Sequence, residues 1–241
     1  MISIIIPAKD EEKYIGECLQ SILDQHMQEP PEIIVVDNAS TDATAYVAGK
    51  FPGVRVVHEP VPGTNQARQR GFRTSQGDVL MFFDADVRLP HGWIDAAIKK
   101  LNMRTDLVAF SAPYSFYDFP LLEITNQIFN YLIARPFCFI FIRSLRVVAQ
   151  MSGGVMVIRR NVLEQIGGFD TNRKFYGDDT GTAMKLKKVG YVAYDFGSWV
   201  HSSGRRYLKK GLLKTISIYM FNLFYIWFRG EPYHEDEEIV R

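Results

Sequence analysis

Cysteine is scarce in this 241-residue chain, which contains only Cys18 and Cys138. Two cysteines without a CxxC pairing exclude a disulfide framework and a zinc site built on cysteine, and they favour a reducing compartment. The chain also lacks a strong net charge, because 28 Lys and Arg residues oppose 27 Asp and Glu residues to give +1. Such a balance provides no overall field that would hold a nucleic acid. We therefore predict a cytoplasmic protein without a nucleic-acid partner.

Long apolar runs are missing as well. No uncharged run reaches the ~18 residues of a transmembrane helix, and the most apolar stretch, Phe137–Ile142, is far shorter. Residues 1–4 lack the basic region and cleavage site of a secretory signal. What the chain has is 47% hydrophobic and 23% charged residues, a composition typical of globular proteins. A length of 241 residues without a Gly/Pro-rich linker favours one large α/β domain.

Short β-branched and apolar runs alternate with helical spacing along the first 83 residues. Strands are predicted at Ile2–Ile6, Glu32–Val36, Val54–Val57 and Val79–Phe83. Apolar residues at helical spacing from 14 to 23 predict a helix between the first two strands, and a second helix is expected over 65–75. Continuous apolar strands are typical of a mostly parallel sheet covered by helices on both faces. Ligands bind such sheets outside the carboxyl ends of the strands.

Two later stretches combine basic with apolar residues. No Asp or Glu occurs between Ile124 and Leu163, and the segment 205–228 leads from Arg205, Arg206 and three lysines into an aromatic-rich helix. Such a helix either packs on the domain or lies in a lipid headgroup layer, and both alternatives stay open here. We divide the chain into a domain over 1–205 and a basic-aromatic segment over 206–241, whose acidic residues at 231–238 are expected to form a solvated tail.

Carboxylates follow two of the predicted strands. Asp84 and Asp86 form a DxD motif directly after Val79–Phe83. Mg²⁺ or Mn²⁺ is commonly held by one or two carboxylates together with phosphate oxygens, so this position predicts a metal and a diphosphate bound together. A bare DxD is weak evidence, because about one chance match is expected in such a chain. Its place at a strand end is what favours the metal over a solvated loop.

Two further polar residues are expected at the same edge of the sheet. Asp37 follows Glu32–Val36 and would accept hydrogen bonds from a base or ribose, while Ser40 or Thr41 is expected to cap the next helix. Arg68 lies on the helix predicted over 65–75. It is either an exposed helical arginine or a phosphate or base contact.

The second half carries an acid pair and a histidine. Asp178 and Asp179 precede a predicted helix. Adjacent carboxyls resist joint ionisation, so one of them is expected to have a raised pKa and to accept a proton from a substrate hydroxyl. The alternative is that the two carboxylates only stabilise the helix by interacting with the positive N-terminal end of its dipole. His201 is either a packed or surface residue or a ligand of the metal at Asp86.

Taken together, these motifs resemble the family 2 glycosyltransferases with the GT-A fold. The order and spacing match over about residues 1–205, and the ordered series is far more specific than any one motif. Two positions depart from the usual pattern: Asp10 replaces Asn, and Asp178–Asp179 replaces Glu-Asp. The series consists of Pro7–Glu12, Val36–Asp42, Ala67–Arg68, Asp84–Asp86, Gly153–Gly154 and Gly177–Asp179.

The resemblance implies a metal-dependent, inverting transfer from a UDP- or GDP-linked sugar to an acceptor hydroxyl or lipid-linked acceptor. It implies Asp179 as the catalytic base, Mn²⁺ or Mg²⁺ at Asp86 and His201, and Asp84 near the ribose and diphosphate. The acceptor side would include Gly153, Gly154 and Asp178. The remaining donor contacts would be Pro7, Ala8, Glu11, Asp37, Arg68, Arg205 and Arg206.

Two other functions are compatible with parts of the sequence. Asp84–Asp86 and Gly177–Asp179 also resemble pieces of the haloacid dehalogenase phosphatases, but Arg88 stands where that pattern has Thr or Val. A nucleotide-binding membrane-surface module without turnover would explain the basic-aromatic segment but not Asp86, Asp179 and His201 together. The basic and apolar stretches lead to the hypothesis of a peripheral contact with the cytoplasmic face of a membrane and of a saccharide or lipid-linked acceptor.

Overall fold

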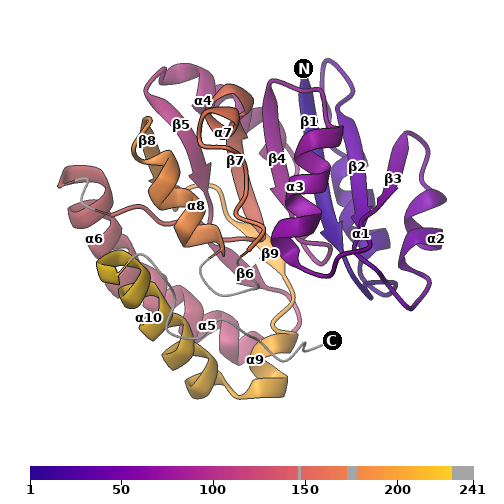
Figure 1. Ribbon diagram of the computed structural model, residues 1–241. Helices are drawn as coiled ribbons and strands as arrows, with labels where there is room; N and C mark the ends of the chain where they lie inside the picture. Colours follow the sequence, from indigo (N-terminus) through magenta and orange to yellow (C-terminus); the bar gives the residue numbers. More distant parts are fainter. Residues whose placement is uncertain (146–147, 173–177, 230–241) are drawn as a thin grey trace.

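A computed structural model describes residues 1–145, 148–172 and 178–229, which form a seven-stranded sheet with helices on both faces (Figure 1). The strand order is β3-β2-β1-β4-β7-β5-β8. Strand β7 runs antiparallel to β4 and β5, and the other neighbours pair in parallel. The predicted mostly parallel sheet is therefore confirmed. Its strands are β1 (Ile2–Ala8), β2 (Glu32–Asp37), β3 (Val54–His58), β4 (Val79–Phe83), β5 (Leu107–Ser111), β7 (Val155–Arg159) and β8 (Tyr191–Tyr194).

Side-chain alternation along the central strands divides the core into two layers. Ile4 and Ile6 of β1 face one layer, which contains α1 (Ile15–Leu23), α2 (Thr44–Gly49) and α4 (Trp93–Met103). Ile5 faces the other, which contains α3 (Thr64–Thr74), α7 (Arg160–Gln165) and α8 (Asp178–Leu186). Because both faces are covered, the central strands are apolar at successive positions, as predicted. The helices predicted over 14–23 and 65–75 and after Asp179 are confirmed as α1, α3 and α8.

A small second sheet pairs two distant segments. Strand β6 (Tyr114–Phe116) lies parallel to β9 (Val200–Ser202). The chain after the DxD motif joins this arrangement, because the Arg88 amide donates to the His201 carbonyl at 2.8 Å and the His201 amide donates back at 3.0 Å. These bonds bring the segment that enters the C-terminal helices next to Asp86.

The remaining helices lie below the sheet and to its left in Figure 1. One continuous helical segment comprises α5 (Pro120–Phe129), the π-helical η1 (Asn130–Ala134), α6 (Arg135–Phe137) and the π-helical η2 (Cys138–Ser144). The other comprises α9 (Arg205–Lys210) and α10 (Leu212–Arg229), which are separated by Gly211 at a φ of 85°.

The basic-aromatic helix predicted from the sequence corresponds to α10. It contacts α8 and α9, and Thr215, Asn222 and Ile226 are buried. At least this side of α10 therefore packs on the domain. Across the described ranges, no helix combines the length and apolar character that crossing a bilayer requires. The acidic residues at 231–238 lie outside the described residues.

Candidate active site

The loops that follow β1 and β2 are tied to each other by side chains. Asp10 Oδ1 accepts hydrogen bonds from the Thr41 amide at 2.6 Å and the Thr41 hydroxyl at 3.1 Å. The Glu11 amide donates to Thr44 Oγ1 at 2.7 Å. Asp10 has a left-handed φ of 52°, a region that Asn and Asp tolerate better than other residues with a side chain. The replacement of the family's Asn by Asp10 is therefore compatible with the local backbone.

Asp37 lies at the carboxyl end of β2, as predicted. In the sheet register it is opposite Ala8, and Val36 is opposite Pro7. Its side chain is buried, and its Oδ2 is 3.1 Å from His58 Nδ1. The expectation that Ser40 or Thr41 caps the next helix is wrong: α2 begins at Thr44, whose amide donates to Asp42 Oδ1 at 2.9 Å. The Ser40 amide instead donates to Asp37 Oδ1 at 3.3 Å, which helps to hold Asp37 in place.

Arg68 connects three parts of the predicted site. Its guanidinium donates from Nη1 to Asp178 Oδ2 at 2.5 Å and from Nη2 to the Gly153 carbonyl at 2.9 Å. The same Nη2 is 3.7 Å from Asp84 Oδ1. Because only 3% of the Arg68 side chain is exposed, it is not the surface arginine of the alternative interpretation. We call Arg68, Asp84, Asp178, Asp179 and Gly153 the Arg68 network.

Gly153 and Gly154 lie where the Arg68 network meets β4. The Gly153 amide donates to Asp179 Oδ2 at 2.9 Å, and the Asp84 amide donates to the Gly154 carbonyl at 3.1 Å. The Gly154 amide donates to the Tyr114 hydroxyl at 2.8 Å. A Cβ atom on Gly154 would come within 2.7 Å of both Asp84 Oδ2 and the Tyr114 hydroxyl. This contact explains why glycine is required here.

One carboxyl of the Arg68 network has a raised proton affinity. Burial, with repulsion from Asp178, raises the pKa of Asp179 to about 6, while the Arg68 charge and hydrogen bonds from the Thr180 and Gly153 amides act in the opposite direction. An acid with a pKa near 6 is mostly ionised at neutral pH and is a stronger base than an ordinary aspartate. The raised pKa expected for one member of the pair is therefore found at Asp179.

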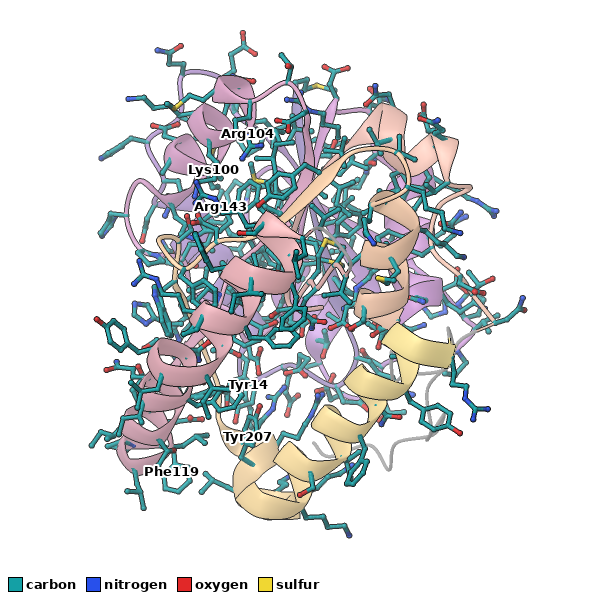
Figure 2. The ribbon with its side chains drawn as sticks, turned by 90° about the vertical axis from the view of Figure 1, so that its left-hand side faces the viewer. Tyr14, Lys100, Arg104, Phe119, Arg143 and Tyr207 are labelled. Atoms are coloured by element: carbon teal, nitrogen blue, oxygen red, sulfur yellow. The ribbon has the colours of Figure 1, made fainter. Side chains whose placement is uncertain are left out.

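A second group of charges surrounds Asp86. Arg205, at the start of α9, donates from Nη2 to Glu11 Oε1 at 2.5 Å and lies 3.3 Å from Asp86 Oδ2. Its guanidinium stacks over the Tyr14 ring at 4.2 Å, and Tyr14 lies beside the turn that leads into α9 (Figure 2). We call Glu11, Tyr14, Asp86 and Arg205 the Arg205 network.

The two networks are adjacent. Asp84 belongs to the Arg68 network and Asp86 to the Arg205 network. The backbone carbonyl of Asp84 accepts a hydrogen bond from Cys18 Sγ at 3.7 Å. Burial, and then the charges of Asp86, Asp84 and Glu11, raise the pKa of the Cys18 thiol well above its ordinary value. Burial also raises the pKa of Asp86 to about 7 against the opposing charge of Arg205. Arg206 also acts on Asp86, because its charge lowers that pKa.

His201 does not join Asp86 in this structure. Its neighbour Ser202 faces Asp86, with the Ser202 hydroxyl 3.4 Å from Asp86 Oδ1. Alternation along β9 therefore directs the His201 side chain to the opposite side. There it lines a cavity of about 720 Å³ with Ser115, Glu123 and Trp199. In this structure the strand geometry thus directs His201 away from Asp86, and a metal shared by the two side chains stays a prediction.

The donor atoms around the DxD motif fit a hard divalent cation. Asp84 and Asp86 offer carboxylate oxygens, and 45% of the Asp84 side chain is exposed. Within the described ranges, no three His, Cys, Asp or Glu side chains converge as a metal site would require. Mg²⁺ is commonly held by one or two carboxylates while phosphate oxygens and water complete its shell, so Asp86 and Asp84 suit a cation that arrives with a diphosphate.

Two residues of the site were missed by the sequence analysis. The Tyr114 hydroxyl and Asp84 Oδ2 both lie beside Gly154, and burial raises the pKa of that hydroxyl well above its ordinary value. It follows the strand Leu107–Ser111, so identifying that strand end would have drawn attention to it. Tyr14, which stacks on Arg205, gave no signal beyond its place in the apolar pattern of α1.

Curated relatives with similar sequences are glycosyltransferases. Glycosyltransferase AglE of Haloferax volcanii is 25% identical over 206 residues, which cover 79% of this chain and 62% of AglE. Glucosyl-3-phosphoglycerate synthase of Mycolicibacterium paratuberculosis is 37% identical over 98 residues, which cover 37% of this chain and 30% of the synthase. The chain therefore spans less than two thirds of the length of these relatives.

Solved structures share the fold. A mannosyltransferase from Pyrobaculum calidifontis, PcManGT, in complex with GDP-Man and Mn²⁺, aligns with a TM-score of 0.72 and 24% identity over 95% of this chain and 63% of that chain. Glucosyl-3-phosphoglycerate synthase from Mycobacterium tuberculosis, in complex with Mn²⁺, UDP and phosphoglyceric acid, aligns with a TM-score of 0.65 and 22% identity over 93% of this chain and 76% of that chain. The expected GT-A fold is thereby confirmed.

The sequence match is decisive for the family. The model of glycosyl transferase family 2 covers residues 3–167, which include the loops after β1 and β2, Arg68, the DxD motif, Gly153 and Gly154. Because this match covers more than half of the sequence, the chain belongs to glycosyl transferase family 2.

Proposed function

We propose that the protein transfers a sugar from a nucleotide-diphosphate sugar to an acceptor hydroxyl, with inversion at the anomeric carbon and with Asp179 as the base. The observation that carries this proposal is the Asp179 carboxylate, with its raised pKa, inside a network that includes Asp84 of the DxD motif. The family membership supports the reaction class. The chain's partial coverage of its relatives makes the activity of the whole protein a proposal.

Asp179 is suited to take the acceptor proton. Its Oδ1 accepts from the Thr180 amide at 2.6 Å and the Thr180 hydroxyl at 3.3 Å. Its Oδ2 accepts from the Gly153 amide at 2.9 Å and has a further lone pair for a proton. As the acceptor hydroxyl gives its proton to Asp179, its oxygen forms a bond to the anomeric carbon. The bond from that carbon to the diphosphate breaks, and the electron pair leaves with the nucleoside diphosphate. Attack from the face opposite the leaving group gives inversion.

The donor would lie along the carboxyl ends of β1, β2 and β4. Pro7, Ala8, Asp37 and Glu11 would contact the base and ribose, at the edge where their strands and loops meet. Asp86, with Asp84, would hold Mn²⁺ or Mg²⁺, and this ion would supply positive charge to the departing diphosphate. Arg205 and Arg206, at the start of α9, would contribute further positive charge to it.

Arg68 has a different role in this proposal from the nucleotide contact expected from the sequence. Its guanidinium is committed to Asp178, Gly153 and Asp84, so it acts as a positioning residue between the base and the DxD motif. Gly153, Gly154 and Asp178 would form the acceptor side, because they adjoin Asp179. The acceptor would be a saccharide or a lipid-linked molecule. The donor would carry UDP or GDP, the nucleotides seen in the complexes of the two similar structures.

Asp179→Asn tests the base directly. The variant keeps the shape of the side chain but cannot take the proton, so transfer from labelled UDP- or GDP-sugars with Mn²⁺ should fall by at least about 100-fold. Donor binding, followed as a thermal shift with nucleotide diphosphate and Mn²⁺, should persist. Chelation by EDTA should abolish the nucleotide-induced shift. Normal turnover by Asp179→Asn would refute the proposed base.

The two other functions considered from the sequence have different outcomes in the same assays. A phosphatase would release phosphate from simple phosphomonoesters without a sugar nucleotide; the family match across Asp84–Asp86 gives that interpretation no support. A non-catalytic nucleotide-binding module would show metal-dependent nucleotide binding with no transfer to any acceptor. Its case is weakened by the raised pKa of Asp179, which nucleotide binding alone does not require.

A further inference from the structure

The helical segment from α5 to η2 exposes a row of large apolar side chains. Between 53% and 64% of each of these residues is exposed, whereas such side chains are usually buried. Positions 121, 124, 128 and 132 recur every three or four residues, so they lie on one face of the helix. We call the following set the apolar strip: Leu121, Ile124, Ile128, Leu132, Ile133 and Phe139.

Few side chains of this helical segment are buried against the domain. Only Leu122, Asn130 and Ile142 are buried among residues 120–144. A helix that is apolar around most of its circumference is normally enclosed by protein or lipid. In the described part of the chain, the apolar strip has no such cover, and contiguous exposed apolar surface of this kind marks an interaction site.

The charges around the apolar strip are of one sign. Arg135 and Arg143 are exposed on the same helical segment. The nearest acid, Glu123, is turned toward the domain, where its carboxylate accepts hydrogen bonds from the Ser115 hydroxyl at 3.0 Å and the Phe116 amide at 2.6 Å. After Glu123 no acidic residue follows until Glu164. Along residues 124–163 the charged side chains that accompany the strip are therefore all basic.

The α9–α10 segment repeats this combination. Leu208 and Phe221 are 53% and 69% exposed, and Lys209, Lys214 and Arg229 are exposed near them along the two helices. Residues 205–229 include no acid. Figure 2 shows the two helical segments on either side of Tyr14 and Tyr207, and Tyr14 belongs to the Arg205 network. Two surfaces of the same chemistry thus flank the candidate active site.

We propose that the apolar strip, together with the exposed face of α9 and α10, binds the surface of a bilayer that contains anionic lipids. Apolar side chains would enter the headgroup and acyl boundary, and arginine and lysine would contact the lipid phosphates. The charge selects this occupant over a second copy of the chain, because pairing two such faces would bring Arg135 and Arg143 toward like charges. The inference extends the proposed function by placing the active site at a membrane surface, where a lipid-linked acceptor resides.

Vesicle flotation tests the surface without any substrate. The full chain is mixed with phosphatidylcholine vesicles or with vesicles that contain 30% phosphatidylglycerol, in 0.1 M NaCl and without nucleotide or metal. We expect flotation with the anionic vesicles and little with the neutral ones. Arg135→Gln with Arg143→Gln should weaken partitioning about 25-fold, since each basic residue near an anionic surface contributes about fivefold. Arg70→Gln with Arg73→Gln, on the exposed side of α3, is the matched control and should bind normally.

The apolar contribution has its own variants. Ile124→Asp and Ile133→Asp should each reduce partitioning by about tenfold or more. Met103→Asp, at a position on α4 that is 77% exposed and outside both helical segments, should have no effect. Circular dichroism checks that each variant is folded. Equal losses from Met103→Asp and Ile133→Asp, or no flotation of the unmodified chain with either vesicle, would overturn the inference.

Two further outcomes separate this inference from the proposed function. Asp179→Asn should float like the unmodified chain. If the unmodified chain floats but transfers no sugar, the result counts against the proposed function alone. Transfer to a soluble acceptor without vesicle binding would overturn the surface alone. Sedimentation could instead show a dimer that Ile133→Asp converts to a monomer, while the unmodified chain does not bind vesicles. That result would assign the apolar strip to a second copy of the chain and refute membrane binding.

Discussion

Asp179→Asn should make the folded protein more stable at neutral pH, in addition to its effect on transfer. The pKa of Asp179 is raised from its ordinary value of 3.8 to about 6, so the folded state favours the protonated acid more than the unfolded state does. Ionisation of Asp179 therefore costs stability, and this cost grows as pH rises from about 3.8 to about 6. Asparagine cannot ionise, so the variant does not carry this cost in stability.

The size of the effect follows from the shift in pKa. A shift of about 2 pKa units corresponds to about 3 kcal/mol of unfolding free energy once the pH is above both values. Against this, an amide has one accepting oxygen, so one of the hydrogen bonds from the Gly153 and Thr180 amides is lost at a cost of about 1 kcal/mol. The net gain for Asp179→Asn at pH 7.5 is about 2 kcal/mol. At pH 4.5 the remaining ionisation cost is about 1 kcal/mol, so the two proteins should be about equally stable.

Urea unfolding of both proteins at pH 4.5 and 7.5, without nucleotide or metal, measures this difference. At pH 7.5 the variant should also melt about 4–8 °C higher, given the enthalpy expected for a chain of this size. Asp42→Asn, at a half-buried position in the loop before α2, is a control and should show no comparable gain at pH 7.5. An unmodified protein that is as stable as Asp179→Asn at pH 7.5, or a gain that does not vary with pH, would show that Asp179 lacks the raised pKa.

Two further predictions concern the same network. Transfer should rise with pH through about 6 as Asp179 loses its proton. Arg68→Gln should move this limb of the kcat profile to higher pH, because the Arg68 charge lowers the pKa of Asp179. Arg68→Lys keeps the charge and should bring the limb most of the way back. A limb that stays in place in Arg68→Gln would contradict this coupling. Gly154→Ala should reduce kcat by at least tenfold, because its Cβ would displace Asp84 and Tyr114, whereas Gly49→Ala, whose Cβ meets open space, should leave kcat unchanged. Equal kcat values for these two alanine variants would refute the role of the contact at Gly154.

The sheet was predictable from the sequence because its strands are short apolar runs that end in acids or turns. The predicted Val79–Phe83 matches β4, and the predicted Glu32–Val36 differs from β2 by one residue. Placing Asp37 and Asp84 at one edge followed from the parallel arrangement alone. Strand β7 was not predicted, although residues 155–158 form an apolar run of the same kind. Its antiparallel place between β4 and β5 depends on pairing with distant segments, which the run itself does not encode.

Side-chain direction was the part that the sequence did not determine. The resemblance to family 2 implied that His201 lies near the DxD motif, and the backbone of its segment does lie there, paired with Arg88. Which of His201 and Ser202 faces Asp86 depends on the register of β9 against β6, and a shift of one residue exchanges the two faces. The partner of Arg68 was equally hidden, because Asp178 is 110 residues away along the chain.

The contact of Arg205 with Glu11 and Asp86 bears on how this protein can be divided. The boundary drawn after residue 205 from composition separates Arg205 from the rest of α9, although the helix is what presents its guanidinium. A fragment trimmed before α9 would retain two largely enclosed carboxylates beside the DxD turn and lose the cation that compensates them. Exchanging the C-terminal helices between relatives would therefore change the charge around Asp86, even with every residue of the matched region 3–167 intact.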